Sequence, residues 1–273
     1  MIVTTINVNG VRAAVRERSE DNRGLLHWLA NTAADVVCLQ EVRADDDQLR
    51  AALAPALGGR WNLASAEPHV RGRSGVAVLS RTPLLAVRTG LAGFEGHGRY
   101  LEADLDAGFG DPVAVGSVYV HTGEAGTERQ REKERFMAVL GARMAELAAG
   151  GRHAVLCGDW NIAHTEHDIK NWKGNLKKAG FLPVERQWLT ELMDAGWVDV
   201  VRRMHPDTPG PYSWWSWRGK AFDNDAGWRI DYHLATPSLA ERTRSARVEK
   251  PAAYALRWSD HAPVTVEFGA QVD

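Results

Sequence analysis

Cysteine is scarce in this chain of 273 residues, which contains only two. Cys38 and Cys157 each lie in an apolar run, Val36-Val37-Cys38-Leu39 and Val155-Leu156-Cys157. We expect buried free thiols rather than a disulfide framework, because cysteine-poor chains are typical of reducing compartments. A cytoplasmic location is therefore expected.

Long hydrophobic runs are also missing. No uncharged apolar stretch of about 18 residues occurs, so no transmembrane helix is predicted. No cationic start followed by an apolar segment precedes the first predicted strand, so no signal peptide is expected. The sequence gives no reason to expect a membrane partner.

The chain carries no excess of one charge, since its formal net charge is -2. This value excludes a globally basic nucleic-acid binder but not a local basic face, because charges are screened beyond about 8 Å at physiological salt. Three predicted loops are basic and either grip phosphates or are simply solvated. They contain Arg71-Gly72-Arg73, the lysines from Lys170 to Lys178 that include Lys173, and Arg218 with Lys220.

Apolar residues and tryptophans are plentiful, at 44% and 11 residues, which is enough for a sizeable core. No Pro/Gly/Ser-rich linker divides the chain, so we expect one domain over residues 1–273. Strands and helices alternate at first, and consecutive strands follow in the middle of the chain. This order predicts an α/β fold in which two mixed β-sheets pack face to face with helices outside.

The predicted elements come from hydrophobic periodicity. Helices are expected at Asn22–Ala33, Gln48–Leu57, Glu128–Ala149 and Glu185–Ala195. Strands are expected at Ile2–Val8, Val36–Gln40, Gly75–Leu79, Tyr100–Leu105, Val113–Val120, His153–Cys157, Tyr212–Trp217, Arg229–Ala235 and Val264–Phe268.

Polar clusters stand where several of these strands end. Glu41 follows the run that ends at Gln40, and a carboxylate there suits Mg²⁺, a hard ion that takes one or two carboxylates. The alternative is an ordinary strand-ending glutamate paired with Arg43. The proximity of Asp260, Asn7 and Asn9 would favour the metal role.

Asp159 and Asn161 flank Trp160 after another predicted strand. Alternate residues of an extended segment point the same way, so this carboxylate and carboxamide can address one substrate atom. Asp159 could then orient or deprotonate a water while Asn161 donates to a phosphoryl oxygen. The alternative is a Gly-Asp turn closed by its own side chain.

Asp231 and His261 form a further candidate pair. An imidazole beside an anionic phosphate needs its other nitrogen fixed by a carboxylate, which also stabilises the cation. The alternative is a core histidine satisfied by a backbone carbonyl. His164 and His167 have a zinc-like spacing, but no third ligand at metal spacing supports zinc there.

Aromatic residues are dense from Tyr212 to Trp217, and Trp228 follows. In a strand, Trp215 and Trp217 would share one face, and Trp214 would take the other. One face should be core, while the other could line a pocket for an unstacked sugar or base. Core packing is the alternative for each tryptophan.

Taken together, these motifs resemble the exodeoxyribonuclease III group of AP endonucleases, within the endonuclease/exonuclease/phosphatase superfamily. The resemblance covers essentially the whole chain. The matching segments, in order, are Asn7-Val8-Asn9-Gly10, Leu39-Gln40-Glu41, Gly72-x-Ser74-Gly75, Tyr119, Gly158-Asp159-x-Asn161, Gly227-x-Arg229-Ile230-Asp231-Tyr232 and Ser259-Asp260-His261.

The resemblance implies a four-layer α/β sandwich and a monomer that uses Mg²⁺, or Mn²⁺ as a substitute. The implied substrate is duplex DNA with abasic or 3′-blocked sites, cut 5′ to the lesion to leave a 3′-hydroxyl, with 3′→5′ exonuclease action alongside. The implied metal-binding residue is Glu41, within a group that includes Asp260, Asn9, Asn7, Asp159 and Asn161. Catalysis is implied for Asp159, for His261 with Asp231, and for Tyr119, Asn161 and Asn7. Substrate binding is implied for Trp214, Trp228 and Ile230, and the basic loops add Arg73, Arg218 and Lys173 as candidates.

One segment departs from the group's pattern. Where many members read Tyr-x-Pro-Asn, this chain reads Tyr119-Val120-His121-Thr122. The departure leaves the balance of endonuclease and exonuclease action open. A phosphatase acting on a non-DNA phosphoester and a catalytically inactive DNA-binding relative are the alternative functions.

Overall fold

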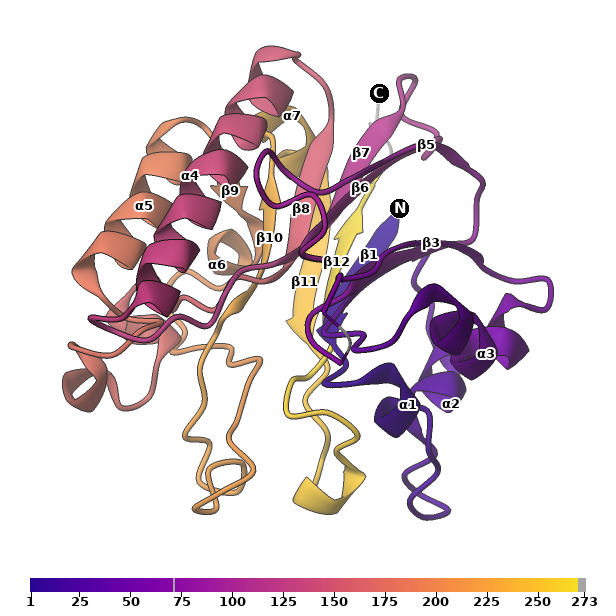
Figure 1. Ribbon diagram of the computed structural model, residues 1–273, viewed down its shortest axis with the longest axis horizontal. Coiled ribbons are helices and arrows are strands. Elements are labelled where there is room, and N and C mark those ends of the chain that lie inside the picture. The colour runs from indigo at the N-terminus through magenta and orange to yellow at the C-terminus, as the bar shows by residue number, and fades with distance from the viewer. Residues whose placement is uncertain (71, 270–273) are drawn as a thin grey trace.

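A computed structural model describes residues 1–70 and 72–269, so Arg71 of the first basic loop lies outside the described residues. Two mixed sheets, each six-stranded, pack face to face in this part of the chain. Helices cover both outer faces, as Figure 1 shows. The predicted four-layer α/β sandwich is confirmed.

The first sheet contains both the first and the last strand of the described chain, side by side. Its strand order is β11 (Thr243–Val248), β12 (Val264–Phe268), β1 (Ile2–Asn7), β2 (Val36–Gln40), β4 (Val76–Ser80) and β3 (Asn62–Ala66). Only the β1–β2 pair is parallel among the pairs of this sheet in the described residues.

The second sheet has a matching arrangement. Its strand order is β5 (Leu84–Thr89), β6 (Tyr100–Leu105), β7 (Val113–Tyr119), β8 (Ala154–Asp159), β10 (Asp231–Ala235) and β9 (Val198–Asp199). Here β7 and β8 are parallel, and the long helix α4 (Glu128–Ala149) makes the crossover that parallel neighbours need.

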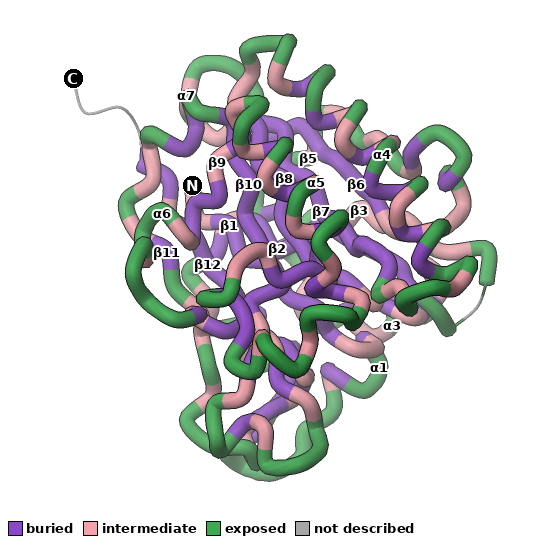
Figure 2. Tube along the Cα trace, turned by 90° about the vertical axis from the view of Figure 1, so that its left-hand side faces the viewer, coloured by how far each residue is buried: buried purple, intermediate pink, exposed green. Residues whose placement is uncertain are grey.

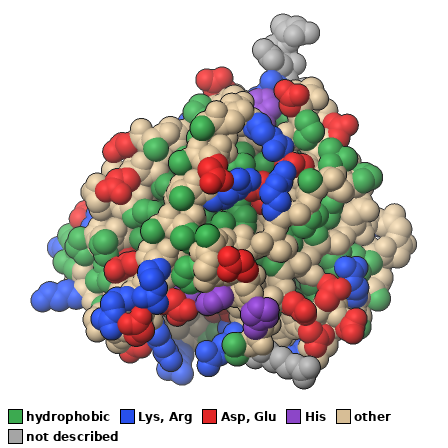
Figure 3. Space-filling model, turned by 45° about the horizontal axis from the view of Figure 1, so that its top comes forward, with side chains coloured by type: hydrophobic (Ala, Val, Ile, Leu, Met, Phe, Trp, Pro, Cys, Tyr) green, Lys and Arg blue, Asp and Glu red, His purple; other side chains and the backbone are tan. Residues whose placement is uncertain are grey.

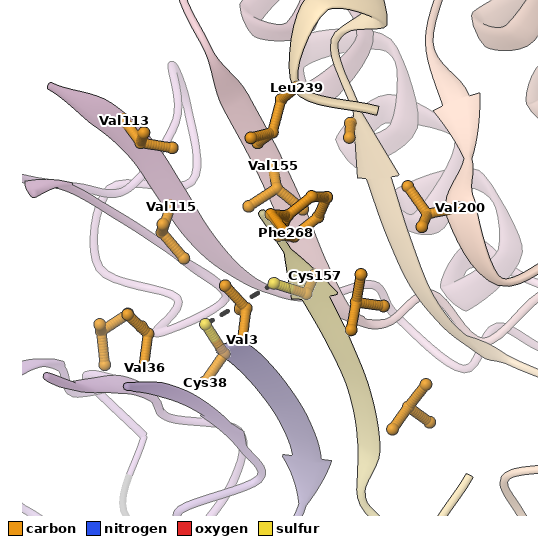
Figure 4. Packing of buried hydrophobic residues seen from close by; sticks show 14 of the residues in the cluster. Val3, Val36, Cys38, Val113, Val115, Val155, Cys157, Val200, Leu239 and Phe268 are labelled. Atoms are coloured by element: carbon orange, nitrogen blue, oxygen red, sulfur yellow. Dashed lines mark hydrogen bonds between the residues drawn. The ribbon is translucent and has the colours of Figure 1, made fainter. Parts of the chain in front are cut away.

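The core between the sheets is apolar and includes both cysteines (Figure 4). Cys38 and Cys157 are fully buried, and their sulfurs lie 3.8 Å apart. Both thiols are free, as the sequence predicts. Val3 and Phe268 pack in the same layer, so the first and last strands are held in the centre of the molecule.

Each outer face is covered by its own helices. Helices α1 (Val11–Ala14), α2 (Gly24–Asn31) and α3 (Asp46–Leu57) contribute to the cluster on the first sheet, and α4 and α5 (Pro183–Asp194) to the cluster on the second. The central strands are accordingly buried and the outward helix faces exposed, as Figure 2 shows. The shorter elements are α6 (Val200–Met204), α7 (Pro237–Ala240), and the 3₁₀ turns η1 (Glu166–Asp168), η2 (Trp172–Asn175) and η3 (Tyr254–Leu256).

The two parallel pairs determine where polar side chains gather. The carboxyl ends of parallel strands meet at the same edge of a sheet, so β1 ends beside β2 and β7 ends beside β8. In the second sheet β10 starts there too, because Asp231 pairs with Asp159 in antiparallel register. Six segments therefore meet at one end of the sandwich when the chain before β12 is included.

The predicted helices and the central strands agree with the structure to within a few residues at their ends. The strand predicted at Tyr212–Trp217 is wrong, because this segment makes only isolated bridges at Trp214. Trp217 accordingly does not share the buried face of Trp215: it is 42% exposed, whereas Trp215 is 1% exposed. Arg257 stacks on the Trp217 ring instead.

The sequence analysis did not predict β3, β5, β9 and β11. Among the described residues, these four are the edge strands of the two sheets. Their side chains are mostly exposed or half-buried, so they show no continuous apolar run. Edge strands need fewer apolar residues because one side lacks a neighbour.

The surface carries both charges side by side. On the face in Figure 3, Lys and Arg lie among Asp and Glu rather than in one large patch, in keeping with the net charge of -2. Among the helices of residues 1–70 and 72–269, none is long and apolar enough to cross a membrane.

Candidate active site

The converging strand ends bring four predicted residues into direct contact. The side-chain amide of Asn7 donates to Glu41 Oε1 at 3.0 Å and to Asp159 Oδ2 at 2.9 Å. The Tyr119 hydroxyl donates to the same Glu41 oxygen at 2.7 Å. Asn7 lies in β1 of the first sheet and Glu41 directly follows β2, whereas Tyr119 and Asp159 end β7 and β8 of the second, so these hydrogen bonds join the two sheets at the site.

Glu41 also pairs with Arg43, the partner that the sequence suggested as the alternative to a metal role. The Glu41 side chain is 13% exposed and the Arg43 side chain 42% exposed, so solvent reaches this end of the pair. The structure therefore contains the Glu41–Arg43 pair that the sequence offered as the alternative.

Three of the polar residues after strands adopt a left-handed backbone. Asn9, Glu41 and Asn161 have φ values of 48°, 50° and 51°. Residues other than glycine rarely take this conformation, although asparagine tolerates it best. Asn161 is therefore not in an extended conformation. The prediction that Asp159 and Asn161 point the same way because they alternate along an extended segment was wrong in that premise.

Asn161 nevertheless reaches Asp159. Its backbone N–H donates to Asp159 Oδ1 at 2.9 Å, and its amide donates to Asp159 Oδ2 at 3.2 Å. Burial raises the pKa of Asp159 to about 7, with help from the negative charges of Asp231 and Glu41 and against the opposing effect of His261. A carboxyl group with this pKa can exchange a proton at neutral pH.

His261 and Asp231 form the expected pair. His261 Nδ1 lies 2.8 Å from Asp231 Oδ2, and His261 Nε2 lies 3.7 Å from Asp159 Oδ2. Burial lowers the pKa of His261, but the charges of Asp231 and Asp159 outweigh it and raise this pKa to about 10. The imidazole is therefore a cation at neutral pH.

Ser213, which the sequence analysis missed, holds Asp231 in place. Its hydroxyl donates to Asp231 Oδ2 at 2.5 Å and accepts the Asp231 backbone N–H at 3.2 Å. Only the aromatic density around Ser213 marked this segment in the sequence, and that density pointed to its tryptophans.

Asp260 lies on the other side of the site. Its carboxylate accepts the Asn9 amide at 2.9 Å and the Trp214 indole N–H at 3.1 Å. Like Asn7 and Asn161, Asn9 presents its NH₂ group to a carboxylate, and an NH₂ group is a donor. The three asparagines therefore orient carboxylates in this structure.

A cleft of about 380 Å³ opens beside these groups. Trp214, Trp228 and Ile230, the three residues that the resemblance assigned to a pocket, lie on its wall together with Asp159 and His261. Trp214 and Trp228 meet edge to face, with ring centroids 6.1 Å apart. The cleft is thus lined by both aromatic and charged side chains.

The three basic candidates lie elsewhere. Arg73, Lys173 and Arg218 are exposed and are not among the residues that line the cleft, whereas Lys178, from the same basic stretch as Lys173, does line it. Lys173 rests over the Trp172 ring, with its nitrogen 5.4 Å from the centroid. Any contact between these three side chains and a substrate would have to occur outside the cleft.

A buried ion pair contacts the backbone of two segments that line the cleft, and the sequence analysis did not predict it. Lys133 Nζ and Glu185 Oε1 lie 2.6 Å apart, and both side chains are fully buried. Lys133 donates to the carbonyl of Asn161 at 2.9 Å, while Glu185 accepts the backbone N–H of Gly180 at 2.7 Å. The pair thus fixes two backbone segments of the cleft.

Comparison with known proteins places the chain in a family. Residues 4–261 match the Endonuclease/Exonuclease/phosphatase family, and the chain belongs to this family. An exodeoxyribonuclease of Bacillus subtilis is 37% identical over 262 residues, which are 94% of this chain and 95% of that protein.

Two solved structures share the fold over nearly the whole chain. The 3′ phosphatase NExo from Neisseria, solved with a product DNA hairpin, has a TM-score of 0.86 and 31% identity, covering 98% of this chain and 99% of that one. An AP endonuclease from Archaeoglobus fulgidus has a TM-score of 0.85 and 27% identity, with the same coverage. The family resemblance seen in the sequence is confirmed.

The charge on His261 can be tested directly. Replacing Asp231 with Asn removes the strongest stabiliser of the imidazolium, so the pKa of His261 should fall from about 10 towards the ordinary 6.5. Ring chemical shifts of His261, measured by NMR against pH in metal-free protein, report this change. Asp260→Asn is the control and should lower the pKa less, because Asp260 acts more weakly on His261. Equal effects of the two variants would contradict the pairing.

Proposed function

We propose that this protein is a divalent-metal-dependent DNA repair nuclease that hydrolyses the phosphodiester bond 5′ to an abasic site. The product carries a 3′-hydroxyl, and the same site removes 3′-blocking groups and digests 3′ ends. The observation that carries this proposal is the contact between Asp159 and the Asn7, Asn161 and His261 side chains at the mouth of an aromatic cleft. The similarity to the Bacillus exodeoxyribonuclease and the Archaeoglobus AP endonuclease supports it.

The donor chemistry of the site fits a hard cation. Glu41 and Asp260 offer carboxylate oxygens, which Mg²⁺ prefers, and Mn²⁺ accepts the same ligands. We assign the metal-holding role to these two residues, with Asn7 and Asn9 orienting their carboxylates. When bound, the cation would neutralise the charge that develops on the phosphoryl group and the leaving oxygen.

Asp159 is assigned as the general base. A base works best when its pKa lies near the working pH, and the pKa of about 7 meets this condition. Asp159 would take a proton from water as the water oxygen bonds to phosphorus and the bond to the 3′-oxygen breaks. The leaving 3′-oxygen would then take a proton from solvent to become the 3′-hydroxyl. Asn7 and Asn161 hold the carboxylate in position for this transfer.

The donors around Asp159 are assigned to the phosphoryl oxygens. His261 is cationic and places Nε2 beside Asp159, so its N–H can reach an oxygen of a phosphate bound there. Tyr119 keeps its proton, because burial and the charges of Glu41 and Asp159 raise its pKa well above the usual value. Asn161 adds an amide donor, and preorganised donors of this kind stabilise the charge of the transition state.

The tryptophan cleft is assigned to the abasic sugar. A nucleotide without a base leaves the helix cheaply, whereas an intact one must sacrifice a few kcal/mol of stacking and pairing. Trp214, Trp228 and Ile230 would accept the bare sugar and exclude one that carries a base. Exposed Arg73, Lys173 and Arg218 are proposed to meet backbone phosphates outside the cleft. A phosphatase acting on a non-DNA phosphoester would need neither the tryptophan-lined cleft nor the exposed basic side chains.

Three broader assignments belong to the same proposal. We assign the chain to one catalytic domain over residues 1–273, because no linker divides it. We also propose that it acts as a monomer and in the cytoplasm. The two free thiols and the similarity to a Bacillus exodeoxyribonuclease favour the cytoplasm.

Replacing Asp159 with Asn tests the proposed base. Turnover on an abasic duplex should fall by about 10²–10⁴-fold, the usual contribution of a positioned proton acceptor, while DNA binding is retained. Single-turnover cleavage and a binding titration separate the two quantities. Asp106→Asn, a matched change in an exposed loop, should leave both unchanged. Native turnover in Asp159→Asn would rule out the assignment.

Removing the metal tests the role of Glu41. Excess chelator should abolish cleavage, and Mg²⁺ or Mn²⁺ should restore it. Glu41→Gln should raise the Mg²⁺ concentration for half-maximal rate at least tenfold, because a neutral amide is a weaker ligand than a carboxylate. Rates measured across a Mg²⁺ series give this value. Full activity in chelator would refute the metal requirement.

Opening the cleft tests substrate discrimination. Trp228→Ala should slow abasic cleavage and lower the ratio of abasic to undamaged-site cleavage, because the wall that excludes a base is lost. Trp215→Ala should instead cost about 3–5 kcal/mol of unfolding free energy, since Trp215 is core. Trp217→Ala is the control: because Trp217 is exposed, neither the cleavage ratio nor the unfolding free energy should change. A destabilised Trp228→Ala protein with an unchanged ratio would place Trp228 in the core and refute the pocket.

A further inference from the structure

A second group of potential metal ligands lies outside the site described above. It consists of His97 before β6, His121 directly after β7, and Glu132 on α4, and their ligand atoms all lie within 4.8 Å of one another. Glu132 Oε1 is 3.6 Å from His121 Nε2 and 3.9 Å from His97 Nδ1. These three residues are called the His97 cluster below.

The spacing suits a small tetrahedral ion. Bonds of about 2.0–2.1 Å to nitrogen and oxygen place tetrahedral ligands roughly 3.4 Å apart. The two separations from Glu132, 3.6 and 3.9 Å, exceed this by a few tenths of an ångström, and the ligand atoms of the two histidines lie within 4.8 Å of each other. His97 and Glu132 have side chains 40% and 36% exposed, so they can close the difference.

An ion would give one of the two His121 ring nitrogens, Nε2, the partner that it lacks. Its side chain is 8% exposed, and its Nδ1 atom has no hydrogen-bond partner among the described residues. Its Nε2 atom faces Glu132 at 3.6 Å, which is too long for a hydrogen bond. A buried imidazole with neither nitrogen hydrogen-bonded is unusual. An ion at Nε2 would satisfy that nitrogen, and the Nδ1 atom would still lack a partner among the described residues.

The surroundings keep the His121 ring neutral and in a fixed position. Burial lowers the pKa of His121 to about 2, with further effects from Arg99, His97, Lys133 and Arg135, and only a neutral imidazole can bind a metal. The ring packs edge to face on Phe94 and Phe136, at centroid distances of 5.8 and 5.3 Å.

The neighbouring charges define the role of Glu132. Arg99, Lys133 and Arg135 are positive and oppose a cation here. The Glu132 carboxylate offsets part of this repulsion and contacts both histidines. Binding should therefore depend on its negative charge and not only on its shape.

We propose that the His97 cluster binds a transition-metal ion of the zinc class, separate from the catalytic centre. Two imidazoles and one carboxylate favour such an ion, whereas the oxygen donors of Glu41 and Asp260 favour Mg²⁺. A fourth ligand position would be left for water.

The ion would tie catalytic segments together. His121 follows Tyr119 by two residues, and Glu132 precedes Lys133, which holds the Asn161 carbonyl. His97 precedes Arg99, whose guanidinium lies over the Tyr119 ring at 4.7 Å. One bound ion thus links the chain before β6, the chain after β7 and α4.

Cobalt binding by the full chain tests the proposal. Co²⁺ is titrated into metal-stripped protein in millimolar Mg²⁺, which occupies the oxygen-rich centre. We expect one tightly bound Co²⁺ with the intense visible bands of a tetrahedral ion, and displacement of these bands by Zn²⁺. His97→Ala and Glu132→Gln should each weaken binding at least tenfold, and both change partly exposed side chains.

Two control variants separate this site from other sources of signal. His69→Ala removes an exposed histidine whose backbone N–H donates to Gly96, and Glu128→Gln changes an exposed glutamate one turn earlier on α4. Both should bind Co²⁺ normally. The proposal is overturned if Co²⁺ does not bind, if His97→Ala and Glu132→Gln keep the signal, if His69→Ala loses it equally, or if only Glu41→Gln abolishes it.

Discussion

The side-chain amide of Asn7 bridges two carboxylates that come from opposite sheets, Glu41 and Asp159. Asn7 is fully buried and Asp159 nearly so, and buried carboxylates are costly unless donors satisfy them. One residue before Glu41, the Gln40 side chain also donates a hydrogen bond to the Ser117 hydroxyl at 2.9 Å across the same interface between the sheets. Further from the site the interface becomes apolar around Cys38 and Cys157. The packing of the sheets therefore fixes the site, because sliding one sheet would break these bonds.

The site also carries backbone strain that its surroundings must hold. Glu41 has a left-handed φ of 50°, and such a conformation costs about 1–3 kcal/mol in a residue other than glycine or asparagine. The Val8 and Val42 backbone hydrogen bonds on either side keep this turn closed. Asn161 is held by Lys133, whose buried charge is matched by Glu185. Breaking such a pair by removing one partner is costly, since it leaves an unpaired buried charge.

The sequence predicts the central strands and the polar residues at their ends, because both leave short, local patterns. Val36–Gln40 followed by Glu41 shows this, since a buried strand is continuously apolar and its polar end is abrupt. Edge strands such as β5 alternate between half-buried and exposed residues and lack that pattern. Contacts between distant segments leave no local trace at all. The Lys133–Glu185 pair and the His97 cluster come together only when α4 packs on the second sheet.

Positive and negative charges nearly balance over the whole chain. The net charge is -2 and the two signs are mixed on the face in Figure 3, so no strong overall field would draw in a polyanion. For the proposed DNA substrate, attraction must then come from basic residues near the cleft, such as Lys178, acting within a Debye length. The carboxylates that would repel a phosphate are already engaged by Asn7, Asn9, Tyr119 and Arg43. A cation bound by Glu41 and Asp260 would reverse the local charge, so metal binding and binding of a phosphodiester should reinforce each other in this site.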